Sequence, residues 1–209
     1  MDLFWDFDGT LFDTYLIMVK SLKQALEVNG ITDQKAHDLY WQMRQGSLGE
    51  TLKSLASTYN LNYTTLESTY RTNEAQLLEK AQPFDRAYEV CQKNIQKNGR
   101  NFLLTHRDIQ AKGLMQHHGF DSLFSGGVTG TDKFPRKPDP ASLNFLIKKF
   151  QTEKKTAIMI GDRNLDILAA HNADIKGILF DPDHLIQVTS QPEKRIKNLA
   201  ELLPLIISH

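Results

Sequence analysis

Residues 3–10 read Leu-Phe-Trp-Asp-Phe-Asp-Gly-Thr, an apolar run that ends in two acids and a turn sequence. Such a run is typical of a buried β-strand, and Asp6 falls where that strand should enter a loop. On an extended backbone Asp6 and Asp8 point to opposite sides, but Gly9 permits a turn that can bring both to one site. An isolated Asp-x-Asp-Gly also fits an ordinary turn, so its meaning depends on the other segments.

Three later segments place polar residues at expected strand ends or helix starts. Thr105 follows the apolar run at 102–104, Lys137 precedes a helix start at 138–140, and the apolar run at 157–160 leads into Gly161-Asp162, with Asp166 four residues later. The carboxyl ends of parallel strands meet at one edge of an open sheet, where ligands bind. We therefore expect Asp6, Thr105 and Asp162 at the same edge.

In chain order, Asp-x-Asp-Gly-Thr, apolar-apolar-apolar-Thr, Lys-Pro-x-Pro and Gly-Asp-x-x-x-Asp resemble the four motifs of the haloacid dehalogenase-like hydrolase superfamily. The match is most similar to its phosphoglycolate phosphatase and β-phosphoglucomutase branch, and it covers essentially the whole chain. The resemblance implies a phosphoric monoester hydrolase: a Mg²⁺-dependent phosphatase that hydrolyses a small phosphate monoester, phosphoglycolate-like or a sugar phosphate, through an aspartyl-phosphate.

The residue types suit this chemistry. A carboxylate can attack a negatively charged phosphate ester only if a divalent cation and fixed positive groups neutralise the phosphoryl oxygens. Carboxylate and carbonyl oxygens form the ligand set that Mg²⁺ prefers.

The resemblance implies a role for each motif residue. Asp6 would be the nucleophile and a metal ligand, and Asp8 would bind the metal through its carbonyl while its side chain acts as general acid and base. Thr105 and Lys137 would clamp the phosphoryl group, and Asp162 would bind Mg²⁺. Asp166 is assigned to the metal site, as an outer residue that orients a ligand or water, and the remaining substrate contacts are expected from Gly9 and Arg44. From spacing alone, Asp162 is expected to cap the helix that carries Asp166.

Composition sets limits on partners and location. The 209 residues include 25 Lys+Arg and 25 Asp+Glu, so no net field favours nucleic acid or an anionic membrane, and the partner should be small. The resemblance implies a small phosphorylated metabolite. No segment approaches the length of a membrane span, and the N-terminus has no secretion signal. The single cysteine, Cys91, is expected to pack in the core. We therefore expect a cytoplasmic protein, a monomer or a weak dimer.

Alternating apolar runs and amphipathic helices predict an α/β fold: a Rossmann-like parallel sheet with helices on both faces. Strands are expected at 3–7, 102–105, 124–128, 156–160 and 177–180, and a helix at 139–150 with Asp139 as N-cap. The long stretch between the first two strands predicts an inserted α-helical domain, and the resemblance implies that this domain is a cap. The expected domains are a core of residues 1–13 and 84–209 and a cap of residues 14–83.

The expected cap shows local helix signals. An apolar stripe from Met18 to Leu26 ends at Asn29-Gly30, a plausible C-cap. Ser47 with Glu50, and Thr64 with Glu67, predict capping boxes.

Two positions depart from the family pattern, and other functions stay open. His106 stands where Asn is common and is expected to be solvated, and Arg163 stands where a small Ser is common. The alternative function is a sugar phosphomutase of the β-phosphoglucomutase type, and an alternative of another class is a non-catalytic phosphate-binding regulator. A receiver domain is disfavoured because its phosphorylated Asp follows a middle strand, and a dehalogenase because that branch lacks the second Asp.

Overall fold

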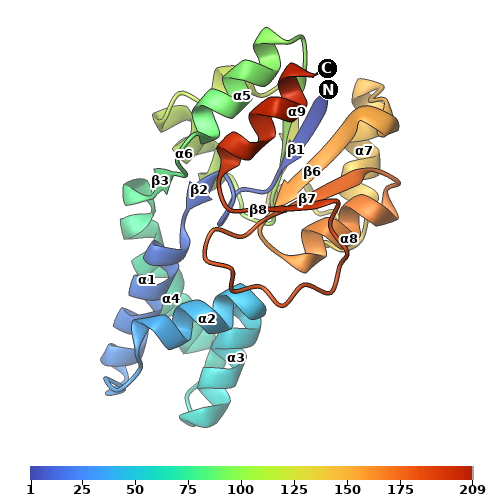
Figure 1. Ribbon diagram of the computed structural model, residues 1–209. Coiled ribbons are helices and arrows are strands. Elements are labelled where there is room, and N and C mark those ends of the chain that lie inside the picture. The colour runs from blue at the N-terminus through green and yellow to red at the C-terminus, as the bar shows by residue number, and fades with distance from the viewer. Residues whose placement is uncertain (209) are drawn as a thin grey trace. The chain divides into compact units, whose positions relative to one another are not determined.

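The computed structural model describes residues 1–208, and the chain divides into two compact units. Met1–Phe12 and the chain from Pro83 onward form one unit, called here the core unit. Asp13–Gln82 form the other, called here the helical unit. Figure 1 shows the strands of the core unit as a sheet with helices on both faces and the helical unit as a group of helices.

Within residues 1–208, six parallel strands form the sheet of the core unit in the order β5-β4-β1-β6-β7-β8. This confirms the predicted α/β fold class. The strands are β1 (Asp2–Trp5), β4 (Arg100–Leu104), β5 (Gly126–Val128), β6 (Ala157–Gly161), β7 (Lys176–Phe180) and β8 (Lys194–Ile196). Strand β8 was not predicted, because it is a short edge strand without an apolar run.

The first strand lies at the centre of the sheet, where it is buried throughout. In register, Phe4 lies beside Phe102 of β4 and Met159 of β6. The strand ends at Trp5 rather than at the predicted Phe7, although the Asp6 N–H still donates to the Ile160 carbonyl at 2.9 Å. Asp6 is therefore held at the carboxyl edge of the sheet.

Five helices of the core unit have been assigned within residues 1–208: α5 (Ala87–Gln96), α6 (Gln110–His117), α7 (Ala141–Phe150), α8 (Asn164–Asn172) and α9 (Leu203–Ile207). The predicted apolar face of α7 is buried against the sheet through Leu143, Leu146 and Ile147. Its start is one residue later than predicted, because Pro140 is the N-cap while Asp139 accepts a hydrogen bond from the Ala141 N–H.

The helical unit contains α1 (Tyr15–Val28), α2 (Ala36–Gln45), α3 (Leu48–Thr58) and α4 (Tyr63–Leu77). It has its own apolar core, which includes the expected stripe of α1. The α1 helix ends at the predicted Asn29-Gly30, where Gly30 has φ +79°. The Ser47 cap of α3 is present, but the Thr64 capping box is wrong: Asn62 caps α4 by accepting from the Thr65 N–H.

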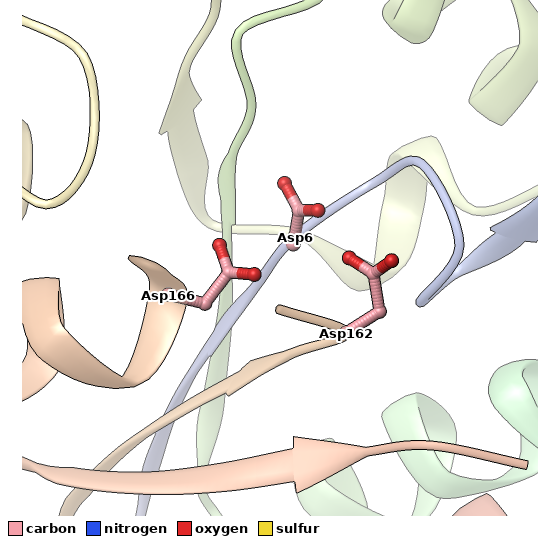
Figure 2. Close-up of side chains that lie close together, drawn as sticks. All are labelled: Asp6, Asp162 and Asp166. Carbon is pink, nitrogen blue, oxygen red and sulfur yellow. The ribbon is translucent and has the colours of Figure 1, made fainter. Parts of the chain in front are cut away.

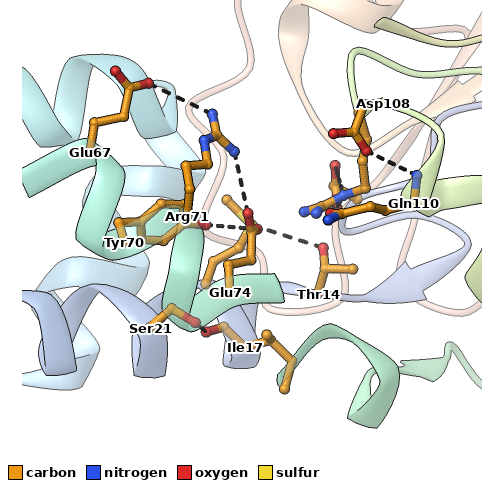
Figure 3. A network of polar contacts seen from close by, with 12 residues as sticks. Thr14, Ile17, Ser21, Glu67, Tyr70, Arg71, Glu74, Asp108 and Gln110 are labelled. Carbon is orange, nitrogen blue, oxygen red and sulfur yellow. Dashed lines mark hydrogen bonds and ion pairs between the residues drawn. The ribbon is translucent and has the colours of Figure 1, made fainter. Parts of the chain in front are cut away.

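A buried polar group lies inside the helical unit (Figure 3). Glu74 accepts a hydrogen bond from the Tyr70 hydroxyl at 2.8 Å and pairs with Arg71 at 3.3 Å. Because these partners satisfy the carboxylate, Glu74 can be buried without the full cost of desolvation.

The remaining elements are short. Strands β2 (Phe12–Asp13) and β3 (Gln82–Pro83) pair with each other where the chain passes between the units. Single 3₁₀ turns are η1 (Leu78–Lys80), η2 (Asp121–Leu123), η3 (Gly130–Asp132), η4 (Lys154–Thr156) and η5 (Leu199–Leu202). Among residues 1–208, no helix combines the length and apolar character required to cross a bilayer.

Candidate active site

Three carboxylates gather at the carboxyl edge of the sheet. Asp6 follows β1, Asp162 follows β6, and Asp166 lies in the first turn of α8 (Figure 2). All three are buried, and one oxygen from each lies within 4.8 Å of the others. The first and last motifs thus supply one cluster of oxygen donors.

A buried lysine joins this cluster. Lys137 Nζ lies 2.6 Å from Asp6 Oδ1 and 2.5 Å from Asp166 Oδ1, and it also donates to the Leu104 carbonyl at 3.3 Å. The Lys137 side chain is 1% exposed, so its charge acts in a weakly screened environment. The residue that was expected to clamp a phosphoryl group is therefore in contact with the expected nucleophile.

The cluster carries excess negative charge. Burial raises the pKa of Asp6 to about 8, with Lys137 opposing this shift and Asp166 and Asp162 adding to it. Burial by itself would lower the pKa of Lys137, but the charges of Asp166 and Asp6 outweigh burial and hold that pKa above its ordinary value. The two shifts therefore differ in their leading cause, which is burial for Asp6 and the neighbouring carboxylates for Lys137.

The junction between β6 and α8 differs from the prediction. Arg163, not Asp162, is the N-cap of α8, and the Asp166 carboxylate accepts from the Arg163 N–H at 3.0 Å. This contact turns Asp166 back across the helix start, so that its oxygens join those of Asp162. Asp162 precedes this N-cap, and its Oδ1 lies 3.9 Å from Arg163 Nε.

The second motif contributes Thr105 and an arginine that the sequence reading did not select. The Arg107 N–H donates to Thr105 Oγ1 at 3.0 Å. The Arg107 guanidinium contacts Asp8 through Nε, at 2.8 Å from Oδ1 and 3.1 Å from Oδ2, and through Nη2 at 2.8 Å from Oδ1. The position of Arg107, two residues after the expected strand-end Thr105, was the sequence signal that could have identified it as a site residue.

His106 is not solvated as expected. Its Nε2 accepts a hydrogen bond from the Lys137 N–H at 2.9 Å, which requires an unprotonated Nε2. Burial, with Lys137, Arg163 and Arg136 adding to it, lowers the pKa of His106 to about 3. The residue that replaces the common Asn therefore holds the backbone of Lys137.

The last two expected substrate contacts are Gly9 and Arg44. Gly9 has φ +74° and its N–H donates to the Phe12 carbonyl, so it forms the turn that follows Asp8. Arg44 belongs to the helical unit, where it is buried and lies 5.3 Å from the centre of the Tyr15 ring. Substrate contact by either residue stays a prediction.

The family profile of the haloacid dehalogenase-like hydrolases matches residues 3–180. The chain belongs to this family. The resemblance stated from the four motifs is thereby confirmed.

Curated relatives of this haloacid dehalogenase-like protein include phosphatases. Phosphoglycolate phosphatase from Agrobacterium fabrum is 28% identical over 96% of this chain and 89% of its own length. Pyrophosphatase PpaX from Listeria innocua is 25% identical over 98% of this chain and 95% of its own length. Phosphoglycolate phosphatase from Vibrio vulnificus is 36% identical, but that match covers 45% of this chain, and the chain spans only 42% of the length of that relative.

Solved structures of the family share the fold. A hydrolase from Streptococcus pneumoniae is 30% identical, with a TM-score of 0.67 and coverage of 97% of both chains. A predicted phosphoglycolate phosphatase from Haemophilus somnus has a TM-score of 0.83 at 17% identity, covering 97% of this chain and 96% of that chain. The second similarity concerns the fold alone.

Proposed function

We propose that this protein is a Mg²⁺-dependent phosphatase that hydrolyses a small phosphate monoester through an aspartyl-phosphate on Asp6. The observation that carries the proposal is the buried cluster of Asp6, Asp162 and Asp166 with Lys137 at its side. Family membership supports a hydrolase, and the curated relatives support a phosphatase.

The cluster fits a divalent cation. Asp6, Asp162 and Asp166 offer only oxygen donors, which suits Mg²⁺. Three buried carboxylates beside one ammonium also leave negative charge that a divalent cation would balance. When bound, the cation would neutralise phosphoryl oxygens that otherwise repel the Asp6 carboxylate.

The chain's own residues supply the other roles. Asp6 attacks phosphorus and becomes phosphorylated, and Asp8 protonates the leaving oxygen and later takes a proton from the attacking water. Lys137 supplies positive charge beside Asp6, and Thr105 and Gly9 contact the phosphoryl group. His106 keeps the Lys137 backbone in place.

The substrate class follows from the relatives. Their names refer to phosphoglycolate and pyrophosphate, both small phosphorylated anions. We place the substrate in this class and assign a cap role to the helical unit, with Arg44 as its substrate contact. A single buried cysteine, Cys91, suits the reducing cytoplasm, where we expect a monomer or a weak dimer.

The test is phosphate release by purified protein with Mg²⁺ from a panel of 2-phosphoglycolate, pyrophosphate, sugar phosphates and nucleoside monophosphates. Wild type should release phosphate from at least one small substrate, and Asp6→Asn should not. The control is Thr65→Ala, a change at an exposed position whose N–H donates to Asn62, the N-cap residue of α4, and this variant should retain turnover. Conversion of β-glucose 1-phosphate to glucose 6-phosphate without phosphate release would identify a mutase, and binding without turnover would identify a regulator.

A further inference from the structure

The Arg107 guanidinium forms an ion pair with the carboxylate of Asp8, the proposed general acid and base. Arg107 presents two nitrogens to the Asp8 carboxylate, with contacts of 2.8, 2.8 and 3.1 Å. The Arg107 side chain is 7% exposed and that of Asp8 25% exposed, so the pair is screened less than a surface ion pair. A two-nitrogen contact fixes the orientation of a carboxylate as well as its place.

The backbone of Arg107 is itself held on both sides. Its N–H donates to Thr105 Oγ1 at 3.0 Å, and its carbonyl accepts from the Gly130 N–H at 2.8 Å. Gly130 permits this approach, because a Cβ there would lie 2.4 Å from the His106 carbonyl oxygen. The guanidinium therefore projects from a fixed loop between the ends of β4 and β5.

Asp8 lies in a less regular segment. It follows β1 and precedes the Gly9 turn, outside the main sheet, and its backbone forms an isolated bridge with Phe12. A general acid or base must stay within hydrogen-bond reach of its proton partner, and a displacement of about 1 Å can cost roughly 100-fold in rate. The orientation of Asp8 therefore needs an anchor.

We propose that Arg107 is the positioning residue for Asp8 and holds its carboxylate in place through both half-reactions. This inference rests on the proposed function. In the first half-reaction the Asp8 proton passes to the leaving oxygen as the substrate P–O bond breaks and the Asp6 O–P bond forms. In the second, Asp8 takes a proton from water as the water O–P bond forms and the Asp6 O–P bond breaks. Arg107 stays protonated throughout, so it neither gives nor receives a proton.

Two other roles for Arg107 predict different kinetics. A guanidinium that binds substrate phosphate would mainly change KM, and its loss would add to the loss caused by a change at Asp8. A purely structural arginine would lower the stability of the protein and the amount of active enzyme without altering kcat per folded molecule. Loss of a positioning residue lowers kcat only in a protein whose Asp8 can still transfer protons.

The experiment is a double-mutant cycle with Arg107→Gln, Asp8→Asn and the double variant, measured on a substrate that wild type hydrolyses. Arg107→Gln should lower kcat by about 10- to 100-fold with KM within about threefold of wild type. In the Asp8→Asn background the same change should cost less than about twofold. Arg107→Lys keeps the positive charge but lacks the two-nitrogen contact of a guanidinium, so it should recover part of the loss.

Arg86→Gln is the matched control, because Arg86 is an exposed arginine of the core unit paired with Glu89, and its kcat should stay near that of wild type. Circular dichroism and urea unfolding identify any variant that fails to fold, and Arg107→Lys then takes the place of Arg107→Gln in the cycle. Additive losses, or a raised KM with unchanged kcat, would overturn the positioning role while leaving the phosphatase intact. If wild type released no phosphate from the whole panel, the proposed function itself would fail.

Discussion

At the residue scale, Asp6 combines two demands that conflict in the metal-free protein. As the proposed nucleophile it must be ionised to attack phosphorus, yet it is 3% exposed and lies beside two other carboxylates. Burial and these neighbours raise its pKa to about 8 despite the contact with Lys137. A bound cation would favour the ionised form, so metal binding would be coupled to activation of the proposed nucleophile.

This coupling predicts a pH dependence of stability. The pKa of Asp6 rises from an ordinary 3.8 to about 8 on folding, so its contribution is fully present below about pH 4 and is lost as pH rises through about 8. In EDTA, the free energy of unfolding of wild type should therefore fall relative to Asp6→Asn between pH 5 and pH 8. Urea unfolding at both values measures the difference, and Mg²⁺ at pH 8 should stabilise wild type more than the variant. A difference that does not change with pH would contradict the account.

The proposed role of Asp8 in proton transfer leads to a second prediction at the residue scale. Asp8→Asn should slow turnover of alkyl phosphates by about 100-fold or more, and the loss should be smaller for p-nitrophenyl phosphate, whose leaving group needs little protonation. Phosphoenzyme should then accumulate, because water activation is still impaired. Quench-flow with labelled substrate detects it as a burst of protein-bound label. Equal losses for both substrates without a burst would return Asp8 to the role of a turn residue.

At the element scale, the junction between β6 and α8 sets the geometry of the acidic cluster. Asp162 leaves the end of β6, and Asp166 turns back to accept from the Arg163 N–H. Gly161 is packed closely beneath Asp166, since a Cβ at this position would lie 2.3 Å from Asp166 Cβ. The end of β6, Gly161 and the start of α8 therefore together fix the positions of Asp162 and Asp166.

Gly161→Ala tests this support. The added methyl group must displace Asp166, so we expect at least a tenfold loss of activity and a higher Mg²⁺ concentration for half-maximal rate. Gly113→Ala in α6 is the matched control, because a Cβ there meets nothing within 4 Å. That variant should keep full activity and gain up to about 1 kcal/mol of stability. Unchanged metal dependence in Gly161→Ala would show that the junction does not control the cluster.

The elements also show what sequence reading can reach. The buried runs at β1, β4 and β6 are continuous and apolar, so the strands that carry Asp6, Thr105 and Asp162 could be predicted together with the edge where they end. Three contacts could not be predicted: the Asn62 cap, the Arg163 cap and the contact of Arg107 with Asp8. Each depends on which of several polar neighbours reaches a backbone or side-chain partner in the folded chain. His106 was misjudged because its partner, Lys137, is 31 residues away.

At the scale of the whole molecule, the acidic cluster and the inserted helices belong to two units, each with its own apolar core. The proposed metal ligands and the Lys137 contact belong to the core unit, whereas Arg44 belongs to the helical unit. Activity should therefore depend on a cation held by the core unit, whatever substrate the helical unit helps to select.

Removal of the metal tests this dependence. Dialysis against EDTA should abolish phosphate release, and Mg²⁺ should restore it, because without a cation the cluster keeps its excess negative charge. Circular dichroism before and after dialysis checks that the fold persists. Full activity in the presence of the chelator would rule out a metal-dependent mechanism.

The central claim is that phosphate passes through a covalent bond to Asp6. Acid quenching during turnover, followed by borohydride reduction, converts an acyl phosphate to an alcohol, and mass spectrometry of the peptides locates the modified residue. We predict homoserine at position 6 in wild type, in larger amount in Asp8→Asn, and unmodified peptide in protein that has not met substrate. Turnover without any modification at position 6, or with modification at another acid, would contradict the account.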